Sequence, residues 1–203
     1  MTTLDLAQQQ LKQFYHPDAS HVEEVELPPL HVLTLPGHGS PGSELHLAAC
    51  GVLFSLSYTI KFLLEQQHPG LEYTLMPLEG LWWTGDDSPW QEAEDSNRFW
   101  KLLMVQPDEV SEALVEQAKN VVQQKVPSAL LSDVQFERFH EGRAAQLLHL
   151  GPYTDEERTV AQIFAWIKEH GGTSLGTHHE IYLDDASRTP PERLRTILRY
   201  PFS

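Results

Sequence analysis

Apolar residues recur three or four positions apart in the segment that follows Ser40 and Pro41, which predicts a long amphipathic helix. Ser40 and Pro41 predict its start, because a serine side chain accepts hydrogen bonds from the free backbone N–H groups of the first turn, and proline has no N–H group that needs an acceptor. The helix ends before Gly70. Its apolar stripe consists of Leu45, Ala49, Val52, Leu53, Leu56, Ile60, Leu63 and Leu64.

Extended patterns and helical patterns alternate along the rest of the chain. A short helix is predicted at residues 4–15 and an exposed, acidic connector at 16–26. The further predictions are a strand at 30–35, a strand pair or bent strand at 71–83, a loop at 84–97, a strand from 98, a helix from 107 that ends before Pro127, a strand region at 134–150, a helix at 155–170, and two strands around Glu180 and Leu198.

The two halves of the chain resemble each other. "HVLTLPGHGSPGSE" and "AQLLHLGPYTDEE" both show a strand, a glycine, a proline and an acidic helix start, and each is followed by a helix and two strands. One such unit cannot bury both faces of its sheet, so we expect two pseudo-symmetric strand-helix-strand-strand modules that form antiparallel sheet around a central cleft. This is an α+β fold. The alternative is that strand-helix alternation is common and that the repeat has no meaning.

The charge balance disfavours nucleic acid as a partner. The chain carries 29 acidic against 14 basic residues, a formal charge of −15. Residues 1–100 hold 14 acidic residues but only Lys12, Lys61 and Arg98 as basic ones. Such a field repels phosphate backbones and favours neutral or cationic small molecules.

Nothing in the sequence requires an oxidising compartment or a membrane. Cys50 is the single cysteine, so an internal disulfide cannot form, and it lies within an apolar helical pattern as a small core residue. The first 16 residues lack the features of a signal peptide. The uncharged stretch at 45–60 is too short and too polar to span a bilayer. We expect a cytoplasmic protein with no membrane partner, and a homodimer is compatible with the sequence.

No motif predicts a cofactor or a metal. Gly37, Gly39 and Gly42 lack the lysine or the dinucleotide context of a phosphate-binding loop. The eleven histidines include no paired helical arrangement, and the adjacent His178 and His179 point to opposite faces of a strand. We therefore expect no metal site. The chain also lacks the Gly-x-Ser-x-Gly motif of serine hydrolases.

The strand around Glu180 is the best candidate for a site. Strand alternation places His178, Glu180 and Tyr182 on one face and His179 and its neighbours Ile181 and Leu183 on the other. A carboxylate between two hydrogen-bonding rings is either part of a solvated surface or the floor of a site.

Aromatic residues form the second candidate feature. Trp82 and Trp83 are adjacent, so one indole should face the core and the other a cavity; Trp83 is favoured for the cavity. Tyr58 lies on the first long helix and Tyr153 begins the second. All of these residues could be core aromatics. As a set with Glu180, they could instead bind a flat, apolar ligand by stacking.

Several longer strings resemble the GyrI-like small-molecule-binding family. They are "YTIKFLLEQQHPGLEYTLMPLEGLWW", "FWKLLMVQPDEVSEALVEQAKN", "LLHLGPYTDEERTVAQIFAWIKEHGG" and the C-terminal "HHEIYLDDASRTPPERLRTILRYPF". The resemblance covers residues 27–203, and residues 1–26 precede it as an N-terminal extension. It implies the two-module fold with a pocket between the modules.

The family includes effector-binding domains, in which a pocket glutamate meets cationic aromatic drugs, and cyclopropanoid cyclopropyl hydrolases, which open the strained ring of DNA-alkylating natural products. The "PLEGLWW" and "HEIYL" segments are similar to those of the hydrolases. The resemblance matches Glu180 to the pocket glutamate. We therefore expect Glu180 to orient or deprotonate the attacking water and Tyr182 and Tyr153 to donate hydrogen bonds to the carbonyl that becomes a phenolate. Trp82 or Trp83, with Tyr58 and His178, is expected to contact the ligand. A non-catalytic binder of planar hydrophobic or cationic molecules is the alternative, and inhibition of a topoisomerase ranks last.

Overall fold

The computed structural model describes residues 11, 13–70, 73–86, 88, 90 and 92–203 of the chain. The chain divides into two compact units. Among the described residues, the first unit consists of those in 30–139, and the second of those in 11–29 and 140–203. The helix predicted at 4–15 falls mostly outside the described residues, apart from a 3₁₀ helix at Gln13–Tyr15.

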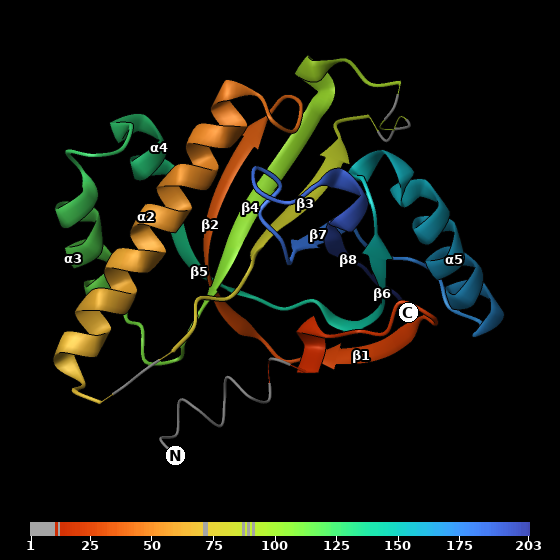
Figure 1. The fold of residues 1–203 in the computed structure, drawn as a ribbon, viewed down its shortest axis with the longest axis horizontal. Helices are drawn as coiled ribbons and strands as arrows, with labels where there is room; N and C mark the ends of the chain where they lie inside the picture. The colour runs from red at the N-terminus through yellow and green to blue at the C-terminus, as the bar shows by residue number, and fades with distance from the viewer. Residues whose placement is uncertain (1–10, 12, 71–72, 87, 89, 91) are drawn as a thin grey trace. The chain divides into compact units, whose positions relative to one another are not determined.

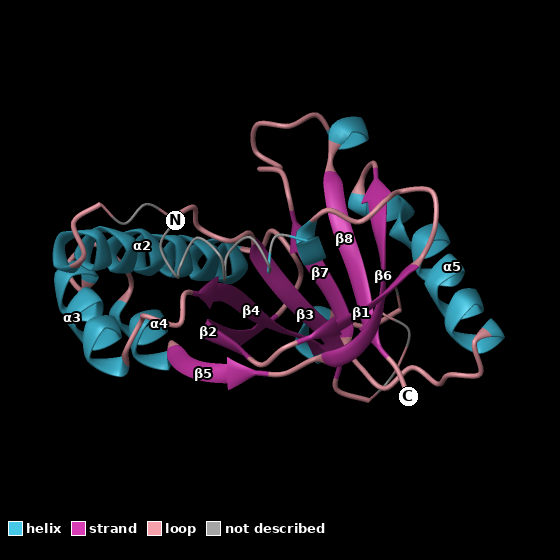
Figure 2. Ribbon diagram, turned by 90° about the horizontal axis from the view of Figure 1, so that it is seen from below, coloured by secondary structure: helices cyan, strands magenta, loops and turns pink. Residues whose placement is uncertain are grey.

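The first unit is an antiparallel sheet that helices cover on one face. Helix α2 lies along β2 and β4, with α3 and α4 beside it (Figures 1 and 2). The strand order is β3-β4-β2-β5, and every neighbouring pair is antiparallel. The elements are β2 (Leu30–His38), α2 (Glu44–Gln67), β3 (Leu78–Thr84), β4 (Arg98–Gln106), α3 (Glu112–Val122), α4 (Ser128–Asp133) and β5 (Gln135–Phe139).

The second unit is also an antiparallel sheet, and one helix packs on it. Its strand order is β1-β6-β8-β7, and α5 lies beside β6 (Figure 1). Its elements are β1 (Glu23–Leu27), β6 (Gly142–Leu150), α5 (Glu156–Glu169), β7 (His178–Tyr182) and β8 (Arg195–Pro201). The core between α5 and the sheet contains Ala145, Leu147, Ile163, Ile167, Leu198, Tyr200 and Phe202. The predicted α+β class with antiparallel pairing is confirmed.

Helix α2 begins later than the sequence predicts. Gly42 adopts a positive φ of 77°, which is not helical geometry, so a helix cannot begin at Pro41. Ser43 rather than Ser40 is the N-cap, and its hydroxyl accepts from the backbone N–H of His46 at 3.3 Å. The stripe predicted for this helix packs against the sheet: Ala49, Val52, Leu53, Leu56, Ile60, Leu63 and Leu64 are buried.

Three segments differ from the predictions. The acidic connector contains β1 (Glu23–Leu27), which pairs with β6. Along this strand the exposed Glu24 and Glu26 alternate with less exposed residues, ending at the buried Leu27. The strand region predicted at 134–150 consists of two strands, β5 and β6, because Gly142 at φ 71° begins β6 after a break. The short helix α4 follows Pro127, which was predicted only to end a helix.

The predicted internal repeat is confirmed by strand register. In both units, five residues connect a strand to the helix that packs on its sheet. In the first unit, Trp82 of β3 pairs with Trp100 of β4. In the second unit, Tyr182 of β7 pairs with Thr196 of β8. The last residue of β2, His38, pairs with Phe99, which directly precedes Trp100. The last residue of β6, Leu150, pairs with Arg195, which directly precedes Thr196. Trp82 and Tyr182 therefore occupy corresponding positions in the two units.

Helix α2 is as long and as apolar as a membrane-spanning helix. The helix has 24 residues, and its most apolar 18-residue window has a mean hydropathy of 1.8, enough by length and composition to cross a bilayer. The apolar part of this helix is therefore longer than the charge-free stretch at 45–60 indicates. Of that window, 44% is buried inside the protein. A helix that supplies the core of a folded unit has the same composition.

Candidate functional site

Strand β7 presents a histidine and a carboxylate on the same face, as strand alternation predicts. His178 Nε2 lies 2.8 Å from Glu180 Oε1, within hydrogen-bonding distance. The two side chains are 24% and 14% exposed, so they are mostly removed from solvent but reachable. Glu180 therefore pairs with His178. The nearby Arg195 and Arg199 have other partners, since they bind Asp184 and Glu141.

A second carboxylate joins this pair from the helix. Glu156 is the first residue of α5, and its side chain is 8% exposed. Its Oε2 atom lies 3.7 Å from His178 Nε2, while its Oε1 atom is buried without a hydrogen-bond partner. The amino end of a helix carries partial positive charge, which favours a carboxylate there. We call Glu156, His178 and Glu180 the carboxylate–histidine cluster.

Sequence reasoning did not single out Glu156, although a signal for it exists. Glu156 shares one face of α5 with Thr159, Ile163 and Ile167, at spacings of three and four residues. All four side chains are buried. An acidic residue in line with a buried stripe marks a carboxylate that faces the inside of the protein.

The environment of the cluster changes the pKa values of its members. Burial raises the pKa of Glu156 to about 7, and the charge of Glu180 adds to this effect, while His178 opposes it. Burial alone disfavours the charged form of His178, but hydrogen bonds and the charges of Glu156 and Glu180 outweigh it and raise its pKa to about 9. At neutral pH, His178 is therefore protonated, and Glu156 lies near the midpoint of its titration.

Tyrosines surround the cluster. The hydroxyl of Tyr200, on β8, is hydrogen-bonded to Nδ1 of His178. The rings of Tyr153 and Tyr182 meet edge to face with centroids 5.9 Å apart. Burial raises the pKa of Tyr153 to about 12 and also raises that of Tyr200, and Glu180 and Glu156 contribute to both shifts. The phenols of Tyr153 and Tyr200 therefore stay protonated at neutral pH, so they can donate hydrogen bonds.

The opposite face of β7 is a buried polar network. His179 is fully buried, and its Nδ1 lies 2.9 Å from Glu141 Oε1. Arg199 donates to Gln146 at 3.0 Å and to the carbonyl of Phe14 at 2.9 Å. This network holds the strand from behind and leaves His178 and Glu180 on the other face.

The aromatic residues Trp82, Trp83 and Tyr58 belong to the first unit. Trp82 is 4% exposed and contacts the rings of His46 and Trp90 at 5.3 and 5.7 Å. Trp83 is 38% exposed and stacks on Phe99 at 6.1 Å. The predicted alternation is confirmed in that Trp82 packs in the core and Trp83 is partly exposed. That Trp83 faces a ligand cavity stays a prediction.

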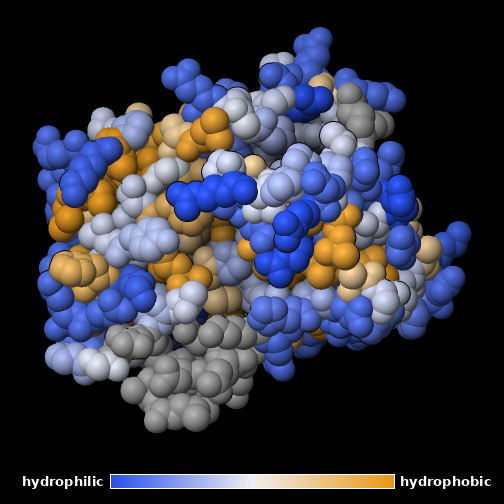
Figure 3. Space-filling view, viewed as in Figure 1, coloured by the Kyte–Doolittle hydropathy of each residue, from blue (hydrophilic) through white to orange (hydrophobic). Residues whose placement is uncertain are grey.

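Tyr58 lies on the outer face of α2 and is 60% exposed. The side chains of Leu47, Phe54 and Phe62, on the same helix, are also exposed. Figure 3 shows apolar side chains gathered in the region of α2. Tyr58 is thus part of an exposed stripe on the helix and does not belong to the carboxylate–histidine cluster of the second unit.

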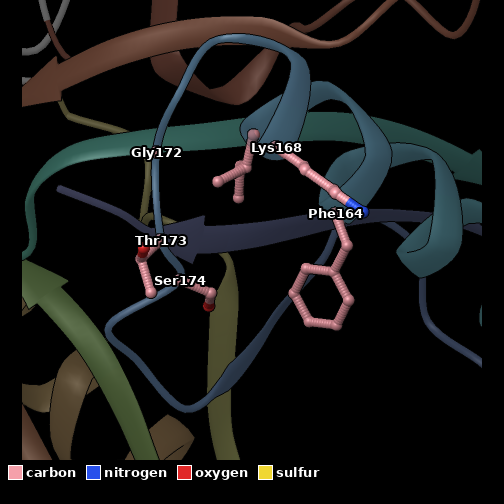
Figure 4. Close-up of a pocket in the computed structure, with 6 residues that line it drawn as sticks. Phe164, Lys168, Gly172, Thr173 and Ser174 are labelled. Atoms are coloured by element: carbon pink, nitrogen blue, oxygen red, sulfur yellow. The ribbon is translucent and has the colours of Figure 1, made fainter.

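A shallow pocket of about 240 Å³ lies at the end of α5. Phe164 and Lys168 project from the helix, and Thr173 and Ser174 follow in the next loop (Figure 4). No carboxylate or histidine lines it. The Phe164 ring also contacts Tyr200 at 4.7 Å, so the pocket borders a residue that supports the cluster but contains none of its acid–base groups.

Comparisons with known proteins agree with this fold. The model of the GyrI-like small molecule binding domain family matches residues 20–202. An uncharacterized conserved protein from Listeria innocua is 32% identical, with a TM-score of 0.86 and coverage of 97% of this chain and 98% of that chain. A hydrolase from Listeria innocua is 31% identical, with a TM-score of 0.82 and the same coverage.

The C-terminal domain of EcmrR is similar in fold alone, at 14% identity and a TM-score of 0.53, over 90% of this chain and 97% of that chain. A comparison with curated proteins gave no match. The family model spans most of the chain, and the Listeria proteins match it over nearly their whole length. The chain therefore belongs to the family of GyrI-like small molecule binding domains.

Proposed function

We propose that this protein is a hydrolase that opens the cyclopropane ring of planar, DNA-alkylating cyclopropanoid compounds and so detoxifies them in the cytoplasm. The carboxylate–histidine cluster is the observation that carries this proposal. It combines a partly exposed carboxylate, Glu180, with a histidine and a second carboxylate that can share a proton with it. The Listeria hydrolase at 31% identity supports the same class of activity.

The reaction needs a base and a hydrogen-bond donor. The oxygen of water attacks the methylene carbon of the cyclopropane, a C–O bond forms, and the strained C–C bond breaks. The electron pair of that bond moves into the conjugated carbonyl, which becomes a phenolate. Glu180 accepts the proton of the attacking water, and the phenolate is then protonated, so the net change is the addition of one water.

The tyrosines are the candidate donors. Tyr153 and Tyr182 meet beside Glu180 and can donate to the carbonyl oxygen as negative charge develops on it. Tyr200 contacts His178 instead, so it holds the histidine in place. Of the two tryptophans, Trp83 is the one on which a planar hydrophobic or cationic ligand can stack, because Trp82 is buried.

Mass spectrometry of a cyclopropanoid compound incubated with the protein tests the proposal. We expect a product one water heavier than the substrate, formed faster than in buffer. Glu180→Gln should slow the reaction on the order of 10²–10⁴-fold, because glutamine cannot accept the proton. Glu157→Gln is the matched control, since Glu157 is an exposed carboxylate in the same helical turn as Glu156. Equal rates with and without wild-type protein would refute the activity.

A non-catalytic binder is the second candidate, and the family's small-molecule-binding character favours it. The exposed Trp83 reports on it directly. Saturable quenching of tryptophan fluorescence by planar cations, without any ring-opened product, would identify a protein that sequesters its ligand.

A further inference from the structure

Three donor atoms converge in the second unit, where His178 is the one basic side chain among the described residues that pairs with the two carboxylates. The ligand atoms of Glu156, His178 and Glu180 all lie within 4.8 Å of one another. Among the described residues, no lysine or arginine forms an ion pair with either carboxylate, since Arg195 and Arg199 bind Asp184 and Glu141. A buried carboxylate, Glu156, and a partly buried one, Glu180, thus share a single histidine as their cationic partner, which is a costly arrangement.

The spacing of the donors suits a metal ion. Two ligands that are each ~2.0–2.2 Å from one ion lie about 3–3.5 Å apart. His178 Nε2 is 2.8 Å from Glu180 Oε1 and 3.7 Å from Glu156 Oε2, so small side-chain movements would give that separation. The buried Oε1 atom of Glu156, which has no hydrogen-bond partner, offers a further donor at the same place.

The other ring nitrogen of His178 is already supported. Metal-bound histidines usually donate their second N–H to a neighbouring group, which fixes the ring and its tautomer. Tyr200 takes this place, because its hydroxyl meets Nδ1 while Nε2 faces the carboxylates. The Phe164 ring packs on Tyr200 at 4.7 Å and restrains it.

We infer that Glu156, His178 and Glu180 form a binding site for a divalent first-row transition cation such as Zn²⁺, Co²⁺ or Mn²⁺. One imidazole and two carboxylates are a donor set that these ions accept, whereas Mg²⁺ and Ca²⁺ prefer oxygen ligands throughout. A dication balances both carboxylates and leaves the histidine neutral. Three protein ligands also leave coordination positions open for water.

Titration calorimetry of the untagged, chelator-treated protein with Zn²⁺ tests this inference. We expect one saturable site in the wild type. Glu156→Gln and His178→Gln should each weaken binding at least 100-fold, and Tyr200→Phe on the order of 10-fold, through loss of support for the ring. Glu157→Gln removes the same charge from the same helical turn and should bind within twofold of wild type.

Co²⁺ gives a second readout, because its visible absorption reports on direct coordination. The spectrum of bound Co²⁺ should appear with the wild type and Glu157→Gln and should be absent with Glu156→Gln, while circular dichroism shows that each variant is folded. Absence of a saturable wild-type site, or equal weakening by Glu156→Gln and Glu157→Gln, would overturn the inference.

The inference stands apart from the proposed hydrolysis, because cation binding is measured without a substrate. In the cation-bound protein, Glu180 is a ligand and does not act as a base. The hydrolysis assay is therefore run in chelator, so that failure of one proposal does not decide the other.

Discussion

The protonation of His178 is the property of the site that can be predicted most directly. In the cation-free protein, its pKa is raised from 6.5 to about 9 because Glu156 and Glu180 hold its proton against the cost of burial. This rise corresponds to about 3 kcal/mol in favour of the protonated folded state. The ring is mostly buried, so solvent screening reduces this figure only in part.

The sign of the pH dependence follows from the raised pKa. The folded protein holds the His178 proton between pH 6.5 and 9, whereas the unfolded chain releases it. The stabilisation is therefore fully present below pH 6.5 and is lost as the pH rises through 9. Glu156, with a pKa raised from 4.5 to about 7, acts in the same direction over its lower range, since the folded protein again holds the extra proton.

Nuclear magnetic resonance titration of the histidine ring signals in chelator measures this directly, and His178→Gln identifies the signal. Denaturant unfolding at pH 6 and pH 9 gives the matching free energies. We expect wild type to lose more stability over this interval than His178→Gln, by on the order of 3 kcal/mol. Glu156→Gln should lower the pKa of His178, and Glu157→Gln should not.

A wild-type His178 that deprotonates near pH 6.5 would refute the reasoning. So would a pH dependence of stability that is identical in wild type and His178→Gln. Either result would mean that the carboxylates do not hold the proton of His178 in solution.

Three further predictions concern the first unit. Trp82→Ala should cost about 3–5 kcal/mol in denaturant unfolding, because the buried indole leaves a cavity, whereas Trp83→Ala should cost about 1–2 kcal/mol; equal losses would contradict the alternation of the two indoles. Burial raises the pKa of the Cys50 thiol to about 11, so little of it is thiolate at pH 8. Iodoacetamide should therefore alkylate the native protein at pH 8 at least ~100-fold more slowly than the unfolded chain. An alkylation rate of the native protein that levels off near pH 8.5 would contradict this. A Cβ on Gly37 would lie 2.2 Å from the buried indole of Trp100, so Gly37→Ala should lower stability by about 1–3 kcal/mol. Gly51 lies within a helix and a Cβ there would have nothing within 4 Å, so Gly51→Ala should raise stability by about 0.5–1 kcal/mol. Thermal unfolding that ranks the two variants otherwise would count against the packing of α2 and β2.

Local periodicity was sufficient to predict much of the fold from the sequence. The stripe of α2 and the faces of β7 follow from the repeat of about 3.6 residues in a helix and two in a strand, which is a property of the backbone. The same rule separated Trp82 from Trp83. The repeat of strand, helix and two strands was also visible, because each unit carries its own turn and helix-start signals.

Pairing between distant segments depended on the tertiary structure. The acidic residues 23–27 became a strand because β6 offered them an edge, and no local pattern specifies that partner. Glu156 reached His178 and Glu180 because α5 packs on the sheet that contains β7, which brings together residues more than 20 positions apart. Which residues share a face of each helix or strand could be predicted from local periodicity. Which faces meet could not, because side-chain contacts across a core depend on how the elements pack.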